Sequence, residues 1–122
     1  MPALSPQDEK NLKAFLRDLV RIPSPSTREK EIAGRIAEEM EKVGFQEVFI
    51  DKIGNVVGRI GSGEGKKLIF DGHMDTVEVG DPWAWERDPY GAEVENGVLY
   101  GLGACDMKGA LAAMVYGVKA LL

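Results

Sequence analysis

The sequence contains one cysteine and one histidine, and this scarcity excludes several kinds of site. With Cys105 alone, neither an intrachain disulfide nor a Cys-x-x-Cys zinc knuckle can form, so we do not expect a structural zinc site. Fifteen basic residues stand against twenty acidic ones, giving a net charge of -5 without a basic block. We therefore exclude nucleic acid as a partner, because binding to a phosphate backbone depends on clustered positive charge.

Long hydrophobic runs are also lacking. The longest nearly apolar run, residues 110–118, is too short to cross a bilayer, and the opening MPALSPQDEKN lacks the basic and apolar regions of a signal peptide. We expect no membrane partner and predict a cytoplasmic protein. With 44% hydrophobic and 29% charged residues, the 122 residues are typical of one globular domain and not of a disordered tail.

Two amphipathic helices are predicted near the start of the chain. Ser5 is a suitable N-cap for the first helix and Pro6 suits its first helical position. The sequence PSPST ends this helix. Ser26 and Glu29 then resemble a capping box that begins a second helix, and Gly44 is a typical stop signal for it.

The composition turns toward strands after Gly44. Strand-like segments occur at residues 45–50, 55–61, 67–73 and 97–101, and an apolar helix is expected over 107–122. Helices mixed with strands predict an α/β fold, in which helices pack on a mixed, largely parallel sheet. Because the last helix carries neither a C-cap nor a polar tail, we expect the chain to be part of a larger domain.

The single histidine lies among carboxylates in LIFDGHMDTVEVG. If the strand continues through this segment, Asp71, His73 and Asp75 share one face. A carboxylate could then accept the proton of one imidazole nitrogen and leave the other nitrogen free to bind a metal or take a proton. This geometry does not distinguish Asp71 from Asp75, and a purely structural histidine is the alternative.

A second carboxylate, Asp106, lies in GLGACDMKG at the entrance of the last helix. It could be a functional group or simply an N-cap, because aspartate is favoured at both the cap and the first turn. The neighbouring Cys105 offers a different chemistry. Together with His73 and Asp75 it could form a Cys-His-Asp nucleophilic triad, although a small buried residue in a crowded turn is the simpler interpretation.

Other candidates have simple structural explanations. Trp83, Trp85 and Tyr90 could form a surface on which a ligand stacks, but such aromatic residues more often cover a long loop. The adjacent carboxylates Glu38 and Glu39 fall on the second amphipathic helix, where we expect a solvated face.

Taken together, GHMDTV, WERDPY, NGVLYGLGACDMKG and the following Ala-rich helix resemble the co-catalytic zinc amidohydrolase and peptidase family that includes acetylornithine deacetylase, succinyl-diaminopimelate desuccinylase, aminoacylases and glutamate carboxypeptidases. The motifs occur in the family's order and spacing over nearly the whole chain. The resemblance implies that His73 binds one metal ion, that Asp106 bridges two, and that Asp75 orients and polarises His73 without binding metal. It implies two divalent ions as cofactors, zinc first, with cobalt or manganese as alternatives.

The resemblance also implies that residues 1–122 are the N-terminal portion of an incomplete zinc-peptidase catalytic domain. The family's later Glu-Glu pair, its second histidine, and its lid and dimerisation domain are absent from the sequence. The parent enzyme is expected to be a homodimer that hydrolyses amide bonds in small N-acyl amino acids or peptides, with a metal-activated water. We expect this chain alone to be inactive and prone to self-association. A non-catalytic truncated binding module is the main alternative, followed by the Cys-His-Asp hydrolase.

Two departures leave the subfamily open. The family often has a proline soon after its His-x-Asp segment, where this chain reads VEVG, and often has an arginine at the position of Leu102. Neither change removes an implied metal ligand.

Overall fold

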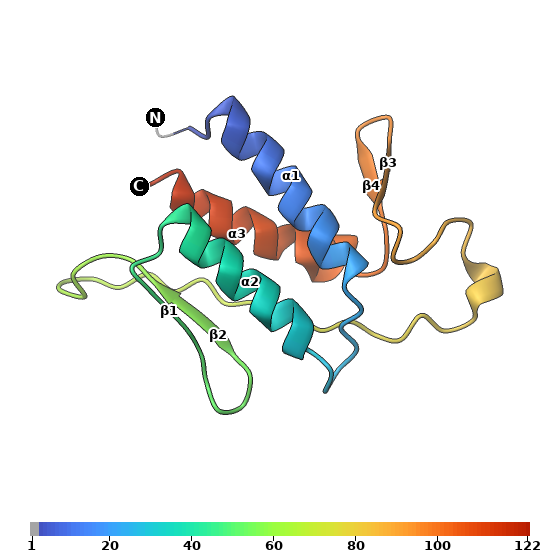
Figure 1. The fold of residues 1–122 in the computed structure, drawn as a ribbon, viewed down its shortest axis with the longest axis horizontal. Coiled ribbons are helices and arrows are strands. Elements are labelled where there is room, and N and C mark those ends of the chain that lie inside the picture. The colour runs from blue at the N-terminus through green and yellow to red at the C-terminus, as the bar shows by residue number, and fades with distance from the viewer. Residues whose placement is uncertain (1–2) are drawn as a thin grey trace.

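The computed structural model describes residues 3–122 and has a helical centre flanked by two small hairpins (Figure 1). The helices are α1 (Pro6–Arg21), α2 (Lys30–Val43) and α3 (Gly109–Lys119). The strands are β1 (Glu47–Ile50), β2 (Val56–Arg59), β3 (Glu93–Glu95) and β4 (Val98–Tyr100). A short 3-10 helix covers Pro82–Ala84, and a π-type turn, Ala104–Lys108, leads into α3.

Local signals in the sequence set the start of α1 and the end of α2 as expected. The Ser5 hydroxyl accepts a hydrogen bond from the Asp8 backbone N–H at 3.1 Å, and the Asp8 carboxylate accepts one from the Ser5 backbone N–H at 3.4 Å. This reciprocal capping box satisfies backbone donors that have no partner inside the helix. At the other end, Gly44 follows α2 in the left-handed conformation, at a φ of 102°, where a side chain would be strained.

The predicted cap of α2 is wrong. The helix begins at Lys30, and Glu29 occupies the N-cap position without a side-chain cap. Ser26 instead donates its hydroxyl proton to the carboxylate of Asp75, which lies 49 residues further along the chain. A capping serine accepts from a backbone N–H of the first turn, but Ser26 lies three residues before the N-cap position, and its hydroxyl donates to a carboxylate instead.

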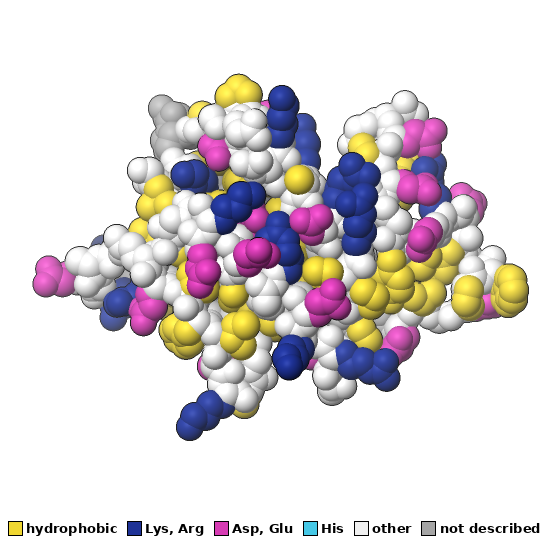
Figure 2. Space-filling view, in the orientation of Figure 1, with side chains coloured by type: hydrophobic (Ala, Val, Ile, Leu, Met, Phe, Trp, Pro, Cys, Tyr) yellow, Lys and Arg dark blue, Asp and Glu magenta, His cyan; other side chains and the backbone are white. Residues whose placement is uncertain are grey.

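The three helices bury one face each in a common core. Its buried members are Phe15, Leu19, Ile32, Ile36, Val43, Leu111, Ala112, Val115 and Tyr116. Because apolar burial is the dominant favourable term in folding, this cluster supplies the main stabilisation of the helical centre. On the face of the molecule drawn in Figure 2, positive and negative side chains are irregularly interspersed.

A polar network crosses this apolar core, and it corrects the prediction that Glu39 lies on a solvated face. Glu39 is fully buried, whereas Glu38 is exposed as expected. Tyr116 of α3 donates its hydroxyl proton to Glu39 Oε1. Arg35 Nη2 lies 2.8 Å from Glu39 Oε2 and 3.1 Å from Asp18 Oδ2 of α1. The buried charge is therefore paired and hydrogen-bonded, as such a group must be.

The mixture of helices and strands agrees with the predicted α/β class, but a largely parallel sheet is not shown. Strands β1 and β2 pair antiparallel, as do β3 and β4. Within residues 3–122 the one parallel pairing outside these strands is a single bridge between Pro25 and Thr76. This bridge matters for the site because it fixes the segment after His73 against the loop after α1.

The strand predicted over residues 67–73 is not formed. A strand requires the backbone groups of a neighbour, and no described segment forms a ladder with this one. Leu68, Ile69 and Phe70 are all exposed, with Ile69 at 82%. In Figure 1 the segment runs without secondary structure behind the helices. No helix among the described residues is both long enough and apolar enough to cross a membrane.

Candidate active site

Three loops far apart in the sequence meet at a cleft of about 250 Å³. They are the loop after α1, the segment that follows His73, and the turn that precedes α3. The cleft is lined by Ser26, His73, Asp75, Thr76, Val77, Leu102, Gly103 and Asp106. The three residues to which the family resemblance assigns roles, His73, Asp75 and Asp106, therefore line the same cleft.

His73 is held between two aspartates. Its Nε2 lies 2.9 Å from Asp106 Oδ1. Its Nδ1 lies 3.0 Å from the backbone oxygen of Asp75 and 3.2 Å from Asp75 Oδ1. These acceptors, the Asp75 backbone oxygen first and the Asp106 carboxylate next, raise the pKa of His73 above its ordinary value. Both ring nitrogens face acceptors, so the protonated imidazolium form of His73 is favoured.

Asp75 is fixed from its other side by Ser26, whose hydroxyl donates to Asp75 Oδ2. This hydrogen bond is the main reason that the pKa of Asp75 is lowered, because it favours the ionised carboxylate. The structure also separates the two aspartates that strand alternation left equivalent. Asp75 contacts the imidazole, whereas Asp71 lies on the exposed segment without a recorded contact to His73 within residues 3–122.

Asp106 is not the N-cap of the last helix. Helix α3 begins three residues later at Gly109, and Asp106 has a non-helical backbone, with φ −124° and ψ 91°. Its side chain is 87% exposed and contacts the imidazole of His73. Gly103 permits this turn, because it has a φ of 75° and a Cβ at this position would lie 2.6 Å from Thr76 Cγ2.

Lys108 anchors the turn that carries Asp106. Its side chain is buried, and Nζ donates to the backbone oxygens of Leu19 at 2.8 Å and Ile22 at 2.9 Å. Burial lowers the pKa of Lys108 to about 8. Sequence reasoning did not single out this residue, because a lysine between a loop and a helix gives no local sign of burial.

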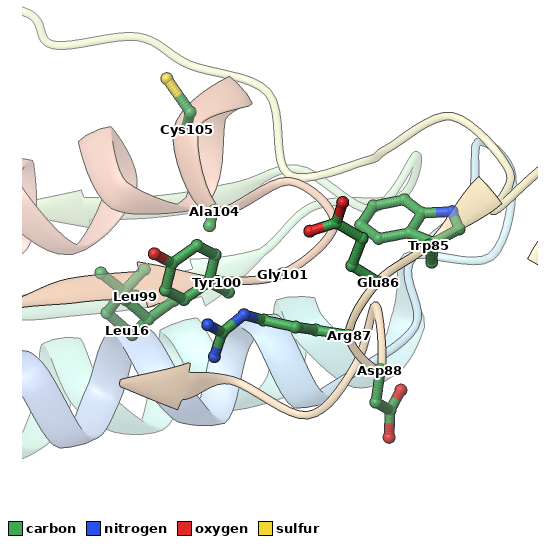
Figure 3. A pocket seen from close by; sticks show the side chains of 10 residues that line it. All are labelled: Leu16, Trp85, Glu86, Arg87, Asp88, Leu99, Tyr100, Gly101, Ala104 and Cys105. Carbon is green, nitrogen blue, oxygen red and sulfur yellow. The ribbon is translucent and has the colours of Figure 1, made fainter. Parts of the chain in front are cut away.

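Cys105 is not placed for the alternative triad. The thiol is exposed, contrary to the prediction of a small buried residue, and both nitrogens of His73 face aspartate oxygens. Cys105 lines a different cleft of about 600 Å³, in which its side chain points away from Arg87 and Tyr100 (Figure 3). The guanidinium of Arg87 stacks 3.9 Å from the centre of the Tyr100 ring.

The three aromatic residues of the long loop do not form one stacking surface. Only Trp85 among them lines the larger cleft, and its indole N–H donates to the backbone oxygen of Val79 at 3.0 Å. Trp83 is 91% exposed, and Tyr90 is half-buried. The indole of Trp85 thus anchors the loop, in agreement with the simpler interpretation, which the exposed Trp83 does not fit.

The donor set at the smaller cleft fits one side of a divalent metal site. One imidazole nitrogen and one carboxylate oxygen, 2.9 Å apart, are ligand types that suit zinc, and the second imidazole nitrogen has the carboxylate partner that metal-bound histidines usually have. No group of three His, Cys, Asp or Glu side chains within residues 3–122 is arranged to hold an ion. Because a catalytic zinc usually takes three protein ligands, His73 and Asp106 alone would supply only part of such a site.

Comparison with known proteins gives a consistent result. Residues 69–122 match the model of peptidase family M20/M25/M40. The uncharacterized protein YgeY of Escherichia coli (strain K12) is 46% identical over 109 residues, which cover 89% of this chain and 27% of that protein. Succinyl-diaminopimelate desuccinylases of Rhodospirillum centenum and Legionella pneumophila are 38% and 37% identical, over 89% and 87% of this chain and 30% and 28% of theirs. The chain thus spans less than a third of the length of these relatives.

Proposed function

We propose that this chain, whose residues 69–122 match the model of peptidase family M20/M25/M40, forms the N-terminal part of the catalytic domain of a metal-dependent amide hydrolase. This match confirms the resemblance inferred from the motifs around His73 and Asp106. The observation that carries the proposal is the imidazole of His73 held between two aspartates at a cleft where three loops meet. The relatives named as desuccinylases support a small acylated substrate, such as an N-acyl amino acid or peptide.

In this proposal His73 Nε2 and the Asp106 carboxylate hold the metal. A bound divalent ion, zinc first and cobalt or manganese as alternatives, would polarise the substrate carbonyl and lower the pKa of a water molecule. The backbone oxygen and carboxylate of Asp75 retain the proton on Nδ1 and so direct the lone pair of Nε2 outward. Because the pKa of His73 is raised, a proton must leave Nε2 before a cation binds, and metal affinity should increase with pH.

The remaining parts of the active site belong to the parent polypeptide. We propose that a C-terminal catalytic portion supplies the other ligands of two metal ions and the general base, and that a lid and dimerisation domain supplies substrate contacts in a homodimer. Because this chain offers one imidazole and one carboxylate for the metal, we expect it to bind zinc weakly and, without a general base, to hydrolyse no amide by itself.

Zinc binding by the chain tests this proposal. Calorimetric titration or competition with a chromophoric chelator should reveal weak binding by the wild type that His73→Ala and Asp106→Asn abolish. Asp71→Asn and Cys105→Ser are matched controls that should bind as the wild type does. Equal zinc affinity in His73→Ala, or tight stoichiometric binding with amide turnover by the wild-type chain, would contradict the proposal.

A further inference from the structure

We propose that Ser26 is a positioning residue of the candidate site, because its hydroxyl holds the Asp75 carboxylate beside Nδ1 of His73. The inference rests on the function proposed above, since it concerns the same imidazole. Ser26 is the member of the cleft that neither motif around His73 or Asp106 contains, and it reaches the site from the loop after α1. Its role follows from three steps of geometry.

The loop that carries Ser26 is fixed against the residues on both sides of Asp75. The Ser24 hydroxyl donates to the backbone oxygen of Met74 at 2.9 Å. The Ser24 backbone oxygen accepts a hydrogen bond from the Thr76 N–H at 2.8 Å. Ser24 and Thr76 are both buried, so these two bonds are shielded from competing water. These backbone-level contacts thus hold the Ser26 loop beside Asp75 independently of the Ser26 side chain.

The two carboxylate oxygens of Asp75 contact different partners. Oδ2 accepts the Ser26 hydroxyl, and Oδ1 lies 3.2 Å from Nδ1 of His73. The carboxylate group of an aspartate rotates about its Cβ–Cγ bond, and this torsion is only weakly restricted. A hydrogen bond to one oxygen restricts the rotation and so keeps the other oxygen directed at the imidazole. Water could occupy the place of the hydroxyl, but it would not be fixed to the loop.

The contacts of Asp75 influence which ring nitrogen of His73 carries the proton. Neutral His73 carries one ring proton, either on Nδ1 or on Nε2. Nδ1 faces the Asp75 backbone oxygen and Asp75 Oδ1, whereas Nε2 faces Asp106. The Asp75 carboxylate adds to the backbone acceptor and favours the tautomer with the proton on Nδ1. That tautomer presents Nε2 as the free ligand. Loss of Ser26 should therefore shift the tautomer balance and leave the fold intact, because Ser26 is exposed.

The size of the effect can be bounded. Loss of a direct hydrogen-bond partner of a metal ligand typically lowers metal affinity 10- to 100-fold. Ser26 acts one bond further out, and the backbone oxygen of Asp75 keeps one acceptor at Nδ1. We therefore expect Ser26→Ala to weaken zinc binding by roughly 3- to 10-fold, less than the loss of a direct partner of the ligand would.

The single histidine makes the test direct, because its two ring nitrogens are the only imidazole signals in a long-range ¹⁵N–¹H spectrum. Metal-free wild type, Ser26→Ala and Ser26→Thr are compared at a pH where the imidazole is neutral, and zinc affinity is measured on the same samples. Wild type should show mainly the Nδ1–H tautomer, Ser26→Ala a larger share of Nε2–H with weaker zinc binding, and Ser26→Thr a return toward wild type. Ser62→Ala, in an exposed glycine-rich loop, is the matched control and Asp75→Asn gives the full effect.

Either of two results would overturn the inference. One is an unchanged tautomer ratio in Ser26→Ala, and the other is a change that Ser26→Thr fails to reverse, because a lost hydroxyl cannot then be the cause. The two readouts also separate this inference from the proposed function. If the wild type binds no zinc, the proposed function fails, while the tautomer ratio of the metal-free samples still decides the role of Ser26.

Discussion

Tyr116→Phe removes one hydroxyl from the buried network that joins the three helices, and the structure allows its cost to be worked out. The Glu39 carboxylate is fully buried, and the Tyr116 hydroxyl is its donor at Oε1. Hydrogen bonds to charged groups contribute about 1.5–3 kcal/mol to stability. Lys42 Nζ, 3.6 Å from the same oxygen, retains part of the compensation. We therefore expect the free energy of unfolding to fall by about 2 kcal/mol.

The assay is urea unfolding followed by far-ultraviolet circular dichroism. Tyr100→Phe is the matched control, because the Tyr100 ring is partly exposed and its hydroxyl has no recorded hydrogen bond within residues 3–122. Loss of that hydroxyl should change stability by less than about 0.5 kcal/mol. A second mutation, Glu39→Gln, completes a double-mutant cycle in which Tyr116 and Glu39 should show coupling. The reasoning is refuted if Tyr116→Phe and Tyr100→Phe unfold at the same urea concentration with equal slopes.

The same pair predicts how stability changes at high pH. Burial, followed by the hydrogen bond to Glu39, raises the pKa of Tyr116 well above its ordinary value. The unfolded tyrosine loses its proton near pH 10, so above that pH the unfolded state binds fewer protons than the folded state. Stability should therefore fall as the pH rises above about 10, and Tyr116→Phe should lack this part of the decrease.

Two further predictions follow from other parts of the molecule. Because burial lowers the pKa of Lys108 to about 8, the unfolded state binds more protons between about pH 8 and 10.5, and stability should rise with pH in that interval. Urea unfolding at several pH values should show this rise in the wild type and in Lys52→Met, and an equal rise in Lys108→Met would contradict it. The exposed segment at Ile69 should promote self-association, so sedimentation velocity should show mass increasing with concentration in the wild type and less so in Ile69→Lys, whereas a wild-type monomer at high concentration would count against it.

The parts of the fold that sequence reasoning anticipated depend on neighbours along the chain. Ser5 and Pro6 begin α1, and Gly44 ends α2, because caps and stops act over three or four residues. The buried position of Glu39 could not be inferred in that way, because its partner Tyr116 lies 77 residues away. Residues 67–73 have strand composition, but a strand also needs a partner, and composition carries no information about one.

In the candidate site, too, local pattern could be read from the sequence, whereas contacts between distant residues could not. Alternation along an extended segment brought Asp71 and Asp75 equally to the side of His73, and the family resemblance chose Asp75, which the structure places against the imidazole. The contact between His73 and Asp106 spans 33 residues, and only the resemblance linked the two motifs. The hydrogen bond from Ser26 spans 49 residues, and the local capping pattern gave Ser26 a different role.

The ammonium of Lys108 has a consequence for how the molecule opens. The last carbonyl groups of a helix lack their usual donors four residues on, and at the end of α1 the side chain of Lys108 donates to two carbonyl groups, those of Leu19 and Ile22. Fraying of that last turn would therefore release the segment that carries Asp106, and release of the segment would expose the helix end. The two belong to one cooperative unit, whose opening would interrupt the contact between His73 and Asp106 and would also uncover Leu19 of the apolar core.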